Sequence, residues 1–130
     1  MTHIESKKVT VNTSATELYQ KLEKPENFKQ AMPESVTKFE ADDNSFVFGM
    51  KGMPEVRLVI KEKVEPELLT FEAASSKLDF TLACHITPID EDTCEAYFHF
   101  EGKFNPMLRM MVEKPLKNFI EALADKLPTL

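Results

Sequence analysis

The chain has 130 residues, of which 42% are hydrophobic and 29% charged, with ten phenylalanines and no tryptophan. This length and composition predict one globular domain spanning residues 1–130, and they exclude a disordered or repetitive chain. The formal net charge of −6, with only two arginines, repels phosphate backbones, so no nucleic-acid partner is expected.

The first predicted elements are a strand and two short helices. The segment "KKVTVNTS" (residues 7–14) alternates valines with polar residues, which is typical of a strand. Ser14, with Glu17 three residues later, predicts a capping box that begins a helix. Pro25 begins a second short helix, and Pro33 ends it.

After Pro33 the hydrophobic period changes from helical to two, which indicates strands joined by short turns. The predicted strands lie at residues 35–43, 45–51, 55–65, 68–75, 77–89 and 93–104. With the N-terminal strand they predict a seven-stranded sheet, antiparallel because tight turns join consecutive strands. Strand alternation assigns to the inner face Phe48, Met50, Leu58, Ile60, Phe71, Phe80, Leu82, Phe98 and Phe100.

The last predicted element is a long amphipathic helix, which includes "NPMLRMMVEKPLKNFIEAL" (residues 105–123). Asn105 is expected to cap it and Pro106 to occupy its first position, whereas Pro115 lies inside it. With a period of 3.6 residues, its apolar stripe consists of Leu108, Met111, Val112, Leu116, Phe119, Ala122 and Leu123. Because one face of the sheet and one stripe of the helix are apolar, each is expected to cover the other.

This element order, with "VTVNTSATELYQKL" near the start and the long helix near the end, resembles the START-like helix-grip superfamily. That superfamily includes pollen allergens, polyketide cyclases and lipid-transfer domains. The resemblance covers essentially the whole chain and rests on architecture, not on catalytic motifs. It implies an α+β fold in which a seven-stranded curved antiparallel sheet wraps a long C-terminal helix, with two short helices after the first strand.

The resemblance also implies a function, because many such proteins keep a cavity between sheet and helix for an apolar molecule. The protein is therefore expected to bind, transport or sequester a small apolar or amphipathic ligand, including lipids. The expected lining comprises the inner-face residues together with Glu62, Leu108, Met111, Val112 and Phe119. The alternative is a filled core, because ten phenylalanines bury a large area in a domain of this size.

Two other functions stay open: a cyclase- or dehydrase-type enzyme, and an adaptor that binds a protein partner and has a filled core. An adaptor predicts an exposed apolar patch, for which Met53 and Met110 are candidates. Catalysis needs polar groups in the cavity, and Glu62 shares the inward phase of Leu58 and Ile60. A single bulge would turn Glu62 to solvent, so no catalytic residue is assigned and binding is preferred to catalysis.

No cofactor is predicted, because the chain has three glycines and no phosphate-binding loop. His85 and His99 belong to the expected outer face, and two histidines without a third ligand predict no metal site. Cys84 and Cys94 are expected on neighbouring strands, too far apart to bridge, as in a reducing compartment. Without an apolar segment for a signal peptide or a bilayer span, the sequence predicts a cytoplasmic protein with no membrane insertion.

Overall fold

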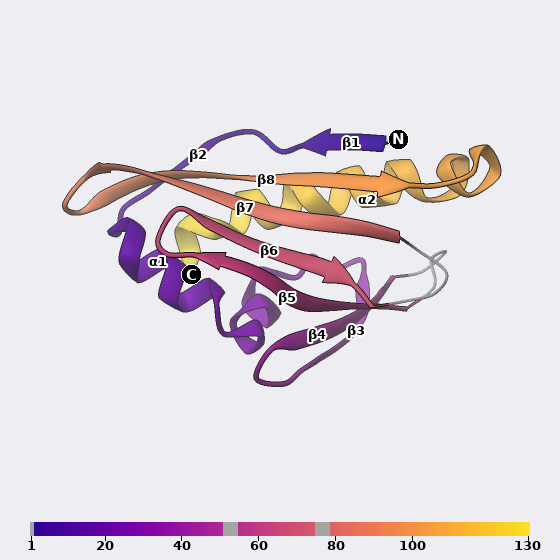
Figure 1. Ribbon diagram of the computed structural model, residues 1–130, viewed down its shortest axis with the longest axis horizontal. Helices are drawn as coiled ribbons and strands as arrows, with labels where there is room; N and C mark the ends of the chain where they lie inside the picture. Colours follow the sequence, from indigo (N-terminus) through magenta and orange to yellow (C-terminus); the bar gives the residue numbers. More distant parts are fainter. Residues whose placement is uncertain (1, 51–54, 75–78) are drawn as a thin grey trace.

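The structure, a computed structural model, describes residues 2–50, 55–74 and 79–130 (Figure 1). In this part of the chain, eight strands form one antiparallel sheet: β1 (Thr2–Glu5), β2 (Val9–Val11), β3 (Val36–Ala41), β4 (Ser45–Met50), β5 (Val56–Val64), β6 (Leu68–Ala73), β7 (Asp79–Asp90) and β8 (Thr93–Lys103). The helical elements are α1 (Ala15–Leu22), η1 (Pro25–Ala31), the long α2 (Pro106–Lys126) and a terminal turn, η2 (Leu127–Thr129). This is the α+β architecture that the sequence predicts.

The sheet is a meander with its N-terminal segments added at one edge. Its strands follow the order β1-β8-β7-β6-β5-β4-β3, and β2 also pairs with β8. Consecutive strands from β3 to β8 are therefore neighbours, as the short turns predict. The sequence predicts one N-terminal strand and seven in total, whereas in the described residues β1 and β2 are separate and the strands number eight.

Ser6 interrupts this edge between β1 and β2. The registers of β1 and β2 against β8 differ by one residue, so the edge contains a bulge. At the bulge, the backbone N–H of Phe98 donates a hydrogen bond to Ser6 Oγ over 2.9 Å. β1 is not predicted by the hydrophobic pattern, because Ile4 is the single large apolar residue of this four-residue strand.

The predicted helix caps are confirmed. Ser14 Oγ accepts a hydrogen bond from the Glu17 N–H at 3.1 Å, and Asn105 Oδ1 accepts one from the Leu108 N–H at 2.8 Å. α2 continues through Pro115 as a 21-residue helix. Within the described residues, none of the helices combines the length and the apolar character that a bilayer span requires.

α2 packs its apolar stripe on the inner face of the sheet, behind β7 and β8 in the view of Figure 1. Its buried residues are Val112, Leu116, Phe119, Ile120, Leu123 and Ala124. Among the described residues, the shortest distance between aromatic ring centroids joins Phe48 of β4 to Phe119 of α2. The two rings stack with their centroids 4.5 Å apart and their planes at 7°. The prediction that sheet and helix cover each other's apolar faces is therefore confirmed.

Phe119→Ala and Phe48→Ala are each expected to lower the free energy of unfolding by about 3–5 kcal/mol, because each leaves a cavity in a packed core. In the double variant the loss should fall short of the sum by about 0.5–1.5 kcal/mol, because the two rings contact each other. Urea denaturation followed by circular dichroism measures these values. Phe39→Ala, at a half-buried ring, is the milder control. Strictly additive losses would contradict a direct stack.

Candidate functional site

Most of the residues predicted to line the space between the sheet and α2 do point into the interior. Those that are buried are Phe48, Met50, Leu58, Phe71, Phe80, Leu82, Phe98, Phe100, Val112 and Phe119. Ile60 and Leu108 are half-buried and pack against the same core. Met111 is exposed, so its predicted burial is wrong. Glu62, named as a lining candidate, is also exposed, as the alternative of a bulge in its strand predicted.

A bulge in β5 turns Glu62 to solvent. Ile60 pairs with Phe71 of β6, but beyond the irregularity Glu62 pairs with Thr70. Successive residues of a strand point to opposite faces, so Thr70 lies on the outer face when Phe71 lies on the inner one. Pairing with Thr70 therefore places the Glu62 carboxylate outside, and it is not a buried acid.

Phenylalanine rings fill the middle of the space between sheet and helix. Phe28 of η1 stacks on Phe46 with centroids 4.9 Å apart, and Phe46 meets Phe71 edge-on at 5.6 Å. The stack of Phe48 on Phe119 continues this cluster up to α2. Centroid separations of this size are those of rings in contact. In this region the packed core, which the sequence left open as the alternative, is what the structure contains.

A second group of rings lies where β8 ends and α2 begins. Phe80 and Phe100 are buried with centroids 4.7 Å apart, and the half-buried Phe104 lies 6.0 Å from Phe100. Gly102 allows this arrangement, because a Cβ there would lie 2.7 Å from Cζ of Phe104. Phe104 is not among the residues predicted to line the cavity, although strand alternation from Phe98 through Phe100 assigns it to the inner face.

The first turns of α2 extend past the ends of β7 and β8 (Figure 1). As a result Met107, Met110 and Met111 are 76%, 85% and 57% exposed. Met111 was predicted in the buried stripe from the helical period alone. Full burial in α2 begins at Val112, and Leu108, one turn earlier, is half-buried against the core, so Met111 lies outside the covered side of the helix.

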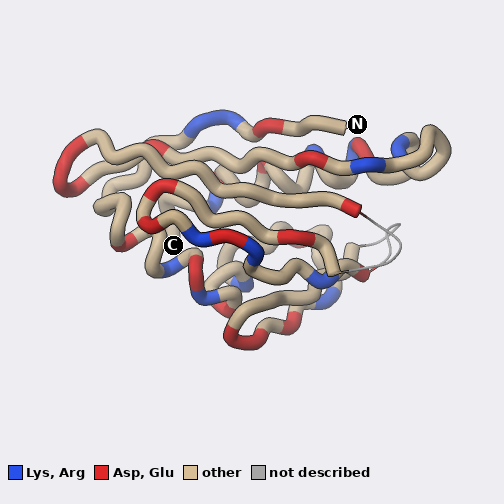
Figure 2. The backbone as a smooth tube through the Cα atoms, viewed as in Figure 1, with Lys and Arg blue, Asp and Glu red and all other residues tan. Residues whose placement is uncertain are grey.

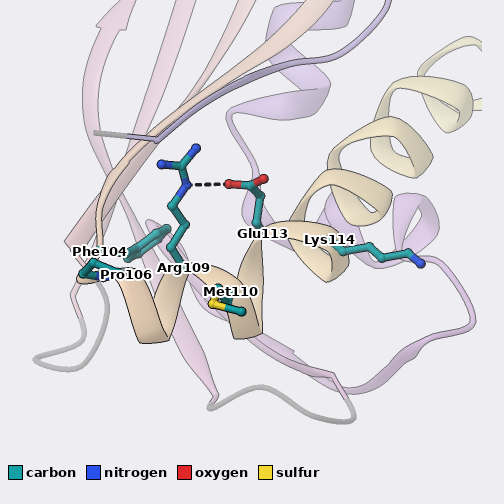
Figure 3. A pocket seen from close by; sticks show the side chains of 6 residues that line it. All are labelled: Phe104, Pro106, Arg109, Met110, Glu113 and Lys114. Atoms are coloured by element: carbon teal, nitrogen blue, oxygen red, sulfur yellow. Dashed lines mark hydrogen bonds and ion pairs between the residues drawn. The ribbon is translucent and has the colours of Figure 1, made fainter.

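The exposed helix start borders a surface hollow of about 540 Å³ (Figure 3). Its lining residues are Phe104, Pro106, Arg109, Met110, Glu113 and Lys114. Arg109 Nε donates a hydrogen bond to Glu113 Oε2 over 2.7 Å, the pairing expected of residues four apart on a helix. The hollow thus combines apolar side chains with an ionic rim.

The two cysteines are not placed to act as nucleophiles. Cys84 and Cys94 are free and buried, and burial raises the pKa of both thiols. Cys84 pairs with Phe98 and Cys94 with Pro88, so the two thiols lie well apart along the ladder. The prediction that they do not bridge is confirmed.

Comparison with known proteins identifies the fold. No family model and no curated protein matches the sequence. Among solved structures, a START superfamily protein from Mycobacterium smegmatis is 13% identical with a TM-score of 0.67, over 98% of this chain and 97% of that one. A conserved protein from Geobacillus kaustophilus is 10% identical with a TM-score of 0.70, over 98% and 93%.

A point mutant of norcoclaurine synthase from Thalictrum flavum, in complex with a transition-state analogue, is also similar. It is 15% identical with a TM-score of 0.69, over 97% of this chain and 93% of that chain. Identities this low carry information on the fold alone. The chain has the START-like helix-grip fold.

In the native protein, both thiols are expected to react with Ellman's reagent only as fast as the chain unfolds, because burial keeps them protonated and out of reach. Absorbance of the released thiolate measures the rate, and the same protein in guanidinium chloride should release two equivalents at once. Rapid reaction of either thiol in the native protein would contradict the burial of Cys84 and Cys94.

Gly102→Ala is expected to destabilise the protein by about 1–3 kcal/mol, because the new methyl group displaces the rings of Phe104 and Phe100. Gly49→Ala is the matched control, since among the residues that the structure describes a Cβ there approaches the side chains of Glu55 and Lys38, at 3.3 and 3.6 Å, and no aromatic ring. Thermal melting compares the two variants. Equal melting temperatures would mean that the Phe104 ring does not depend on Gly102.

Proposed function

We propose that the protein binds a small apolar or amphipathic molecule at the end of the sheet–helix interface where α2 begins. The observation that carries this proposal is the exposure of three methionines within residues 107–111, next to a hollow of about 540 Å³. Single exposed apolar side chains are ordinary, but a contiguous patch of this kind is a common mark of binding surfaces. The volume of the hollow also falls within the ~300–1,000 Å³ of small-molecule sites.

The proposed site extends inward from the hollow along α2. Leu108 and Phe104 are half-buried and pack against the core, and Phe100 and Phe80 lie behind Phe104. An apolar tail lying against these side chains would be removed from water. The stack of Phe48 on Phe119 closes the inner end of the proposed site. The other residues predicted as lining belong to the packed core behind that stack: Met50, Leu58, Ile60, Phe71, Leu82, Phe98 and Val112.

The chemistry of the rim favours an amphipathic ligand. Methionine side chains are flexible and polarisable, so they adapt to apolar bodies of different shapes. Arg109, Glu113 and Lys114 surround the hollow. Figure 2 shows basic residues where β8 passes into α2, and acidic residues at the β7–β8 turn at the opposite end. An apolar body with an anionic or polar head complements this arrangement.

Binding is favoured over catalysis because the charged side chains near the site are either paired with each other or directed to solvent. Arg109 and Glu113 are paired with each other, and Glu62, the acid considered for catalysis, lies on the outer face. Norcoclaurine synthase, solved with a transition-state analogue and with dopamine and hydroxybenzaldehyde, supports small-molecule binding as a use of this fold, in that protein as part of catalysis. The free, buried Cys84 and Cys94 support a reducing compartment such as the cytoplasm.

A protein segment is the second candidate occupant of the same surface. Exposed methionines suit varied peptide partners as well as small molecules, and Met110 lies in the patch as the adaptor hypothesis requires. Met53, the other residue of that hypothesis, lies outside the described residues. We rank a small molecule above a protein segment because a hollow lies beside the methionines.

The anionic fluorophore 8-anilinonaphthalene-1-sulfonate is a suitable probe, since it joins an aromatic body to a charged head. The wild type is expected to bind it saturably, and Met110→Ala to weaken binding about fivefold, from the loss of ~1 kcal/mol of apolar contact. Ile89→Ala is the matched control, because Ile89 is 55% exposed and lies at the end of β7, next to the β7–β8 turn. That turn is at the opposite end of the molecule from the start of α2 (Figure 1). Fluorescence titration gives the affinities.

Equal affinities in the wild type and both variants, or no saturable binding by the wild type, would contradict the small-molecule site. The exposed methionines would then be assigned to a protein partner. Native mass spectrometry of the purified protein gives an independent readout, because a molecule held at the site should remain bound and add its mass.

A further inference from the structure

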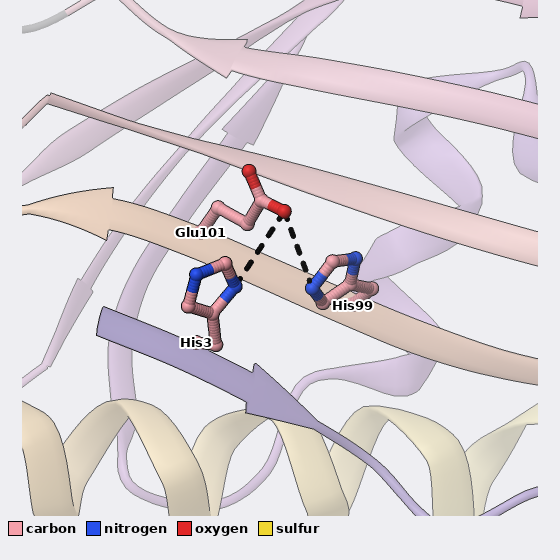
Figure 4. Close-up of side chains that lie close together, drawn as sticks. All are labelled: His3, His99 and Glu101. Atoms are coloured by element: carbon pink, nitrogen blue, oxygen red, sulfur yellow. Dashed lines mark ion pairs between the residues drawn. The ribbon is translucent and has the colours of Figure 1, made fainter. Parts of the chain in front are cut away.

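The outer face of the sheet carries a cluster of metal-ligating side chains that the proposed ligand site does not use. His3 of β1 and His99 and Glu101 of β8 each offer one ligand atom, and these atoms lie within 4.8 Å of one another (Figure 4). Both imidazole rings approach the same carboxylate oxygen, Glu101 Oε1. A cluster of two imidazoles and a carboxylate is therefore held at this edge of the sheet.

The separations between these atoms suit a small metal ion. His3 Nδ1 and His99 Nε2 each lie 3.5 Å from Glu101 Oε1, longer than a good hydrogen bond. In a tetrahedral zinc site with bonds of about 2.0–2.2 Å, ligand atoms are about 3.3–3.6 Å apart. Two of the three separations already have this value, and the third, at most 4.8 Å, can be closed by side-chain rotation.

The β1–β8 ladder holds the three side chains together. His3 lies directly opposite Glu101, and His99 precedes Glu101 by two residues and so shares its face. The rings of His3 and His99 are stacked, with centroids 5.9 Å apart and planes at 15°. Because strand pairing fixes the positions of all three residues, an ion would not have to order the backbone in order to bind.

We propose that His3, His99 and Glu101 bind a divalent metal ion, Zn²⁺ or one of similar preference, with water as the fourth ligand. Two imidazole nitrogens and one carboxylate oxygen form an established zinc ligand set. The side chains of His3, His99 and Glu101 are 55%, 28% and 43% exposed, which leaves access for the ion and its water. The sequence indicated no such site because, without β1, it placed only two histidines on this face.

His85 of β7 lies beside the cluster but is not one of its ligands. Its ring centroid is 6.3 Å from that of His99, and it stacks on Tyr97 at 4.8 Å. Burial, together with the neighbouring His99, lowers the pKa of His85. It is a histidine of the same face, outside the proposed ligand set, and therefore provides the matched control.

A bound ion would tie the N-terminal edge strand to the body of the sheet. β1 has four residues and a neighbour on one side only, β8, in the part of the chain that the structure describes. Ligands from both strands would bridge them, and an ion that binds only the folded state stabilises that state. The cluster lies on the face opposite α2, so this inference does not rest on the proposed function.

Isothermal titration of the metal-free full chain with ZnCl₂ tests the proposal, using His3→Asn, His99→Asn, Glu101→Gln and the control His85→Asn. The wild type and the control are expected to bind one Zn²⁺ per chain with equal affinity. Loss of an outer-shell partner alone costs about 10–100-fold in metal affinity, so each ligand variant should lose at least about tenfold. Circular dichroism verifies that each variant is folded.

Thermal melting with and without ZnCl₂ gives the second readout. The melting temperature of the wild type and of His85→Asn should rise with Zn²⁺, whereas that of His99→Asn should not. Absence of Zn²⁺ binding by the wild type would overturn the proposal. Full affinity in His99→Asn or Glu101→Gln would also overturn it, since it would show binding through His3 alone or elsewhere.

Discussion

The packing of α2 on the inner face of the sheet is the interaction on which the rest of the structure depends. The sheet has one apolar face and the helix one apolar stripe, and neither could remain in water without the other. The stack of Phe48 on Phe119 joins a strand near the middle of the chain to its C-terminal helix. Because α2 is anchored from Val112 onward, its first turns lie beyond the sheet, and their methionines stay exposed.

This packing leaves the molecule with a filled centre and an exposed end that differ in their side chains. At the centre, phenylalanine rings contact one another and form a packed core. At the start of α2 the rings give way to flexible methionines and to the hollow beside Phe104. A rigid core with an adaptable end suits binding at that end, since the scaffold need not reorganise when a ligand arrives. β8 serves both faces, with Phe100 turned inward and His99 and Glu101 outward.

Local signals in the sequence were sufficient for most of the fold. The hydrophobic periods located the strands and helices, Ser14 and Asn105 marked the helix starts, and alternation separated the buried from the wet face of the last two strands. These features depend on near neighbours in the chain, so they can be read without coordinates. Most of the inner-face residues were found in the same way, because a strand residue's face follows from its phase, whereas the hollow beside Phe104 was not predicted.

The sequence by itself therefore determined which segments form strands and helices, and whether most of their residues face the core or the solvent. The tertiary structure alone decided where that regularity is broken: a bulge moved Glu62 outward, and the end of the sheet left Met111 uncovered. It alone brought His3 opposite Glu101, and it alone filled the centre with rings in contact. Registers, bulges and side-chain packing depend on contacts between residues distant in sequence, and no local period encodes those contacts.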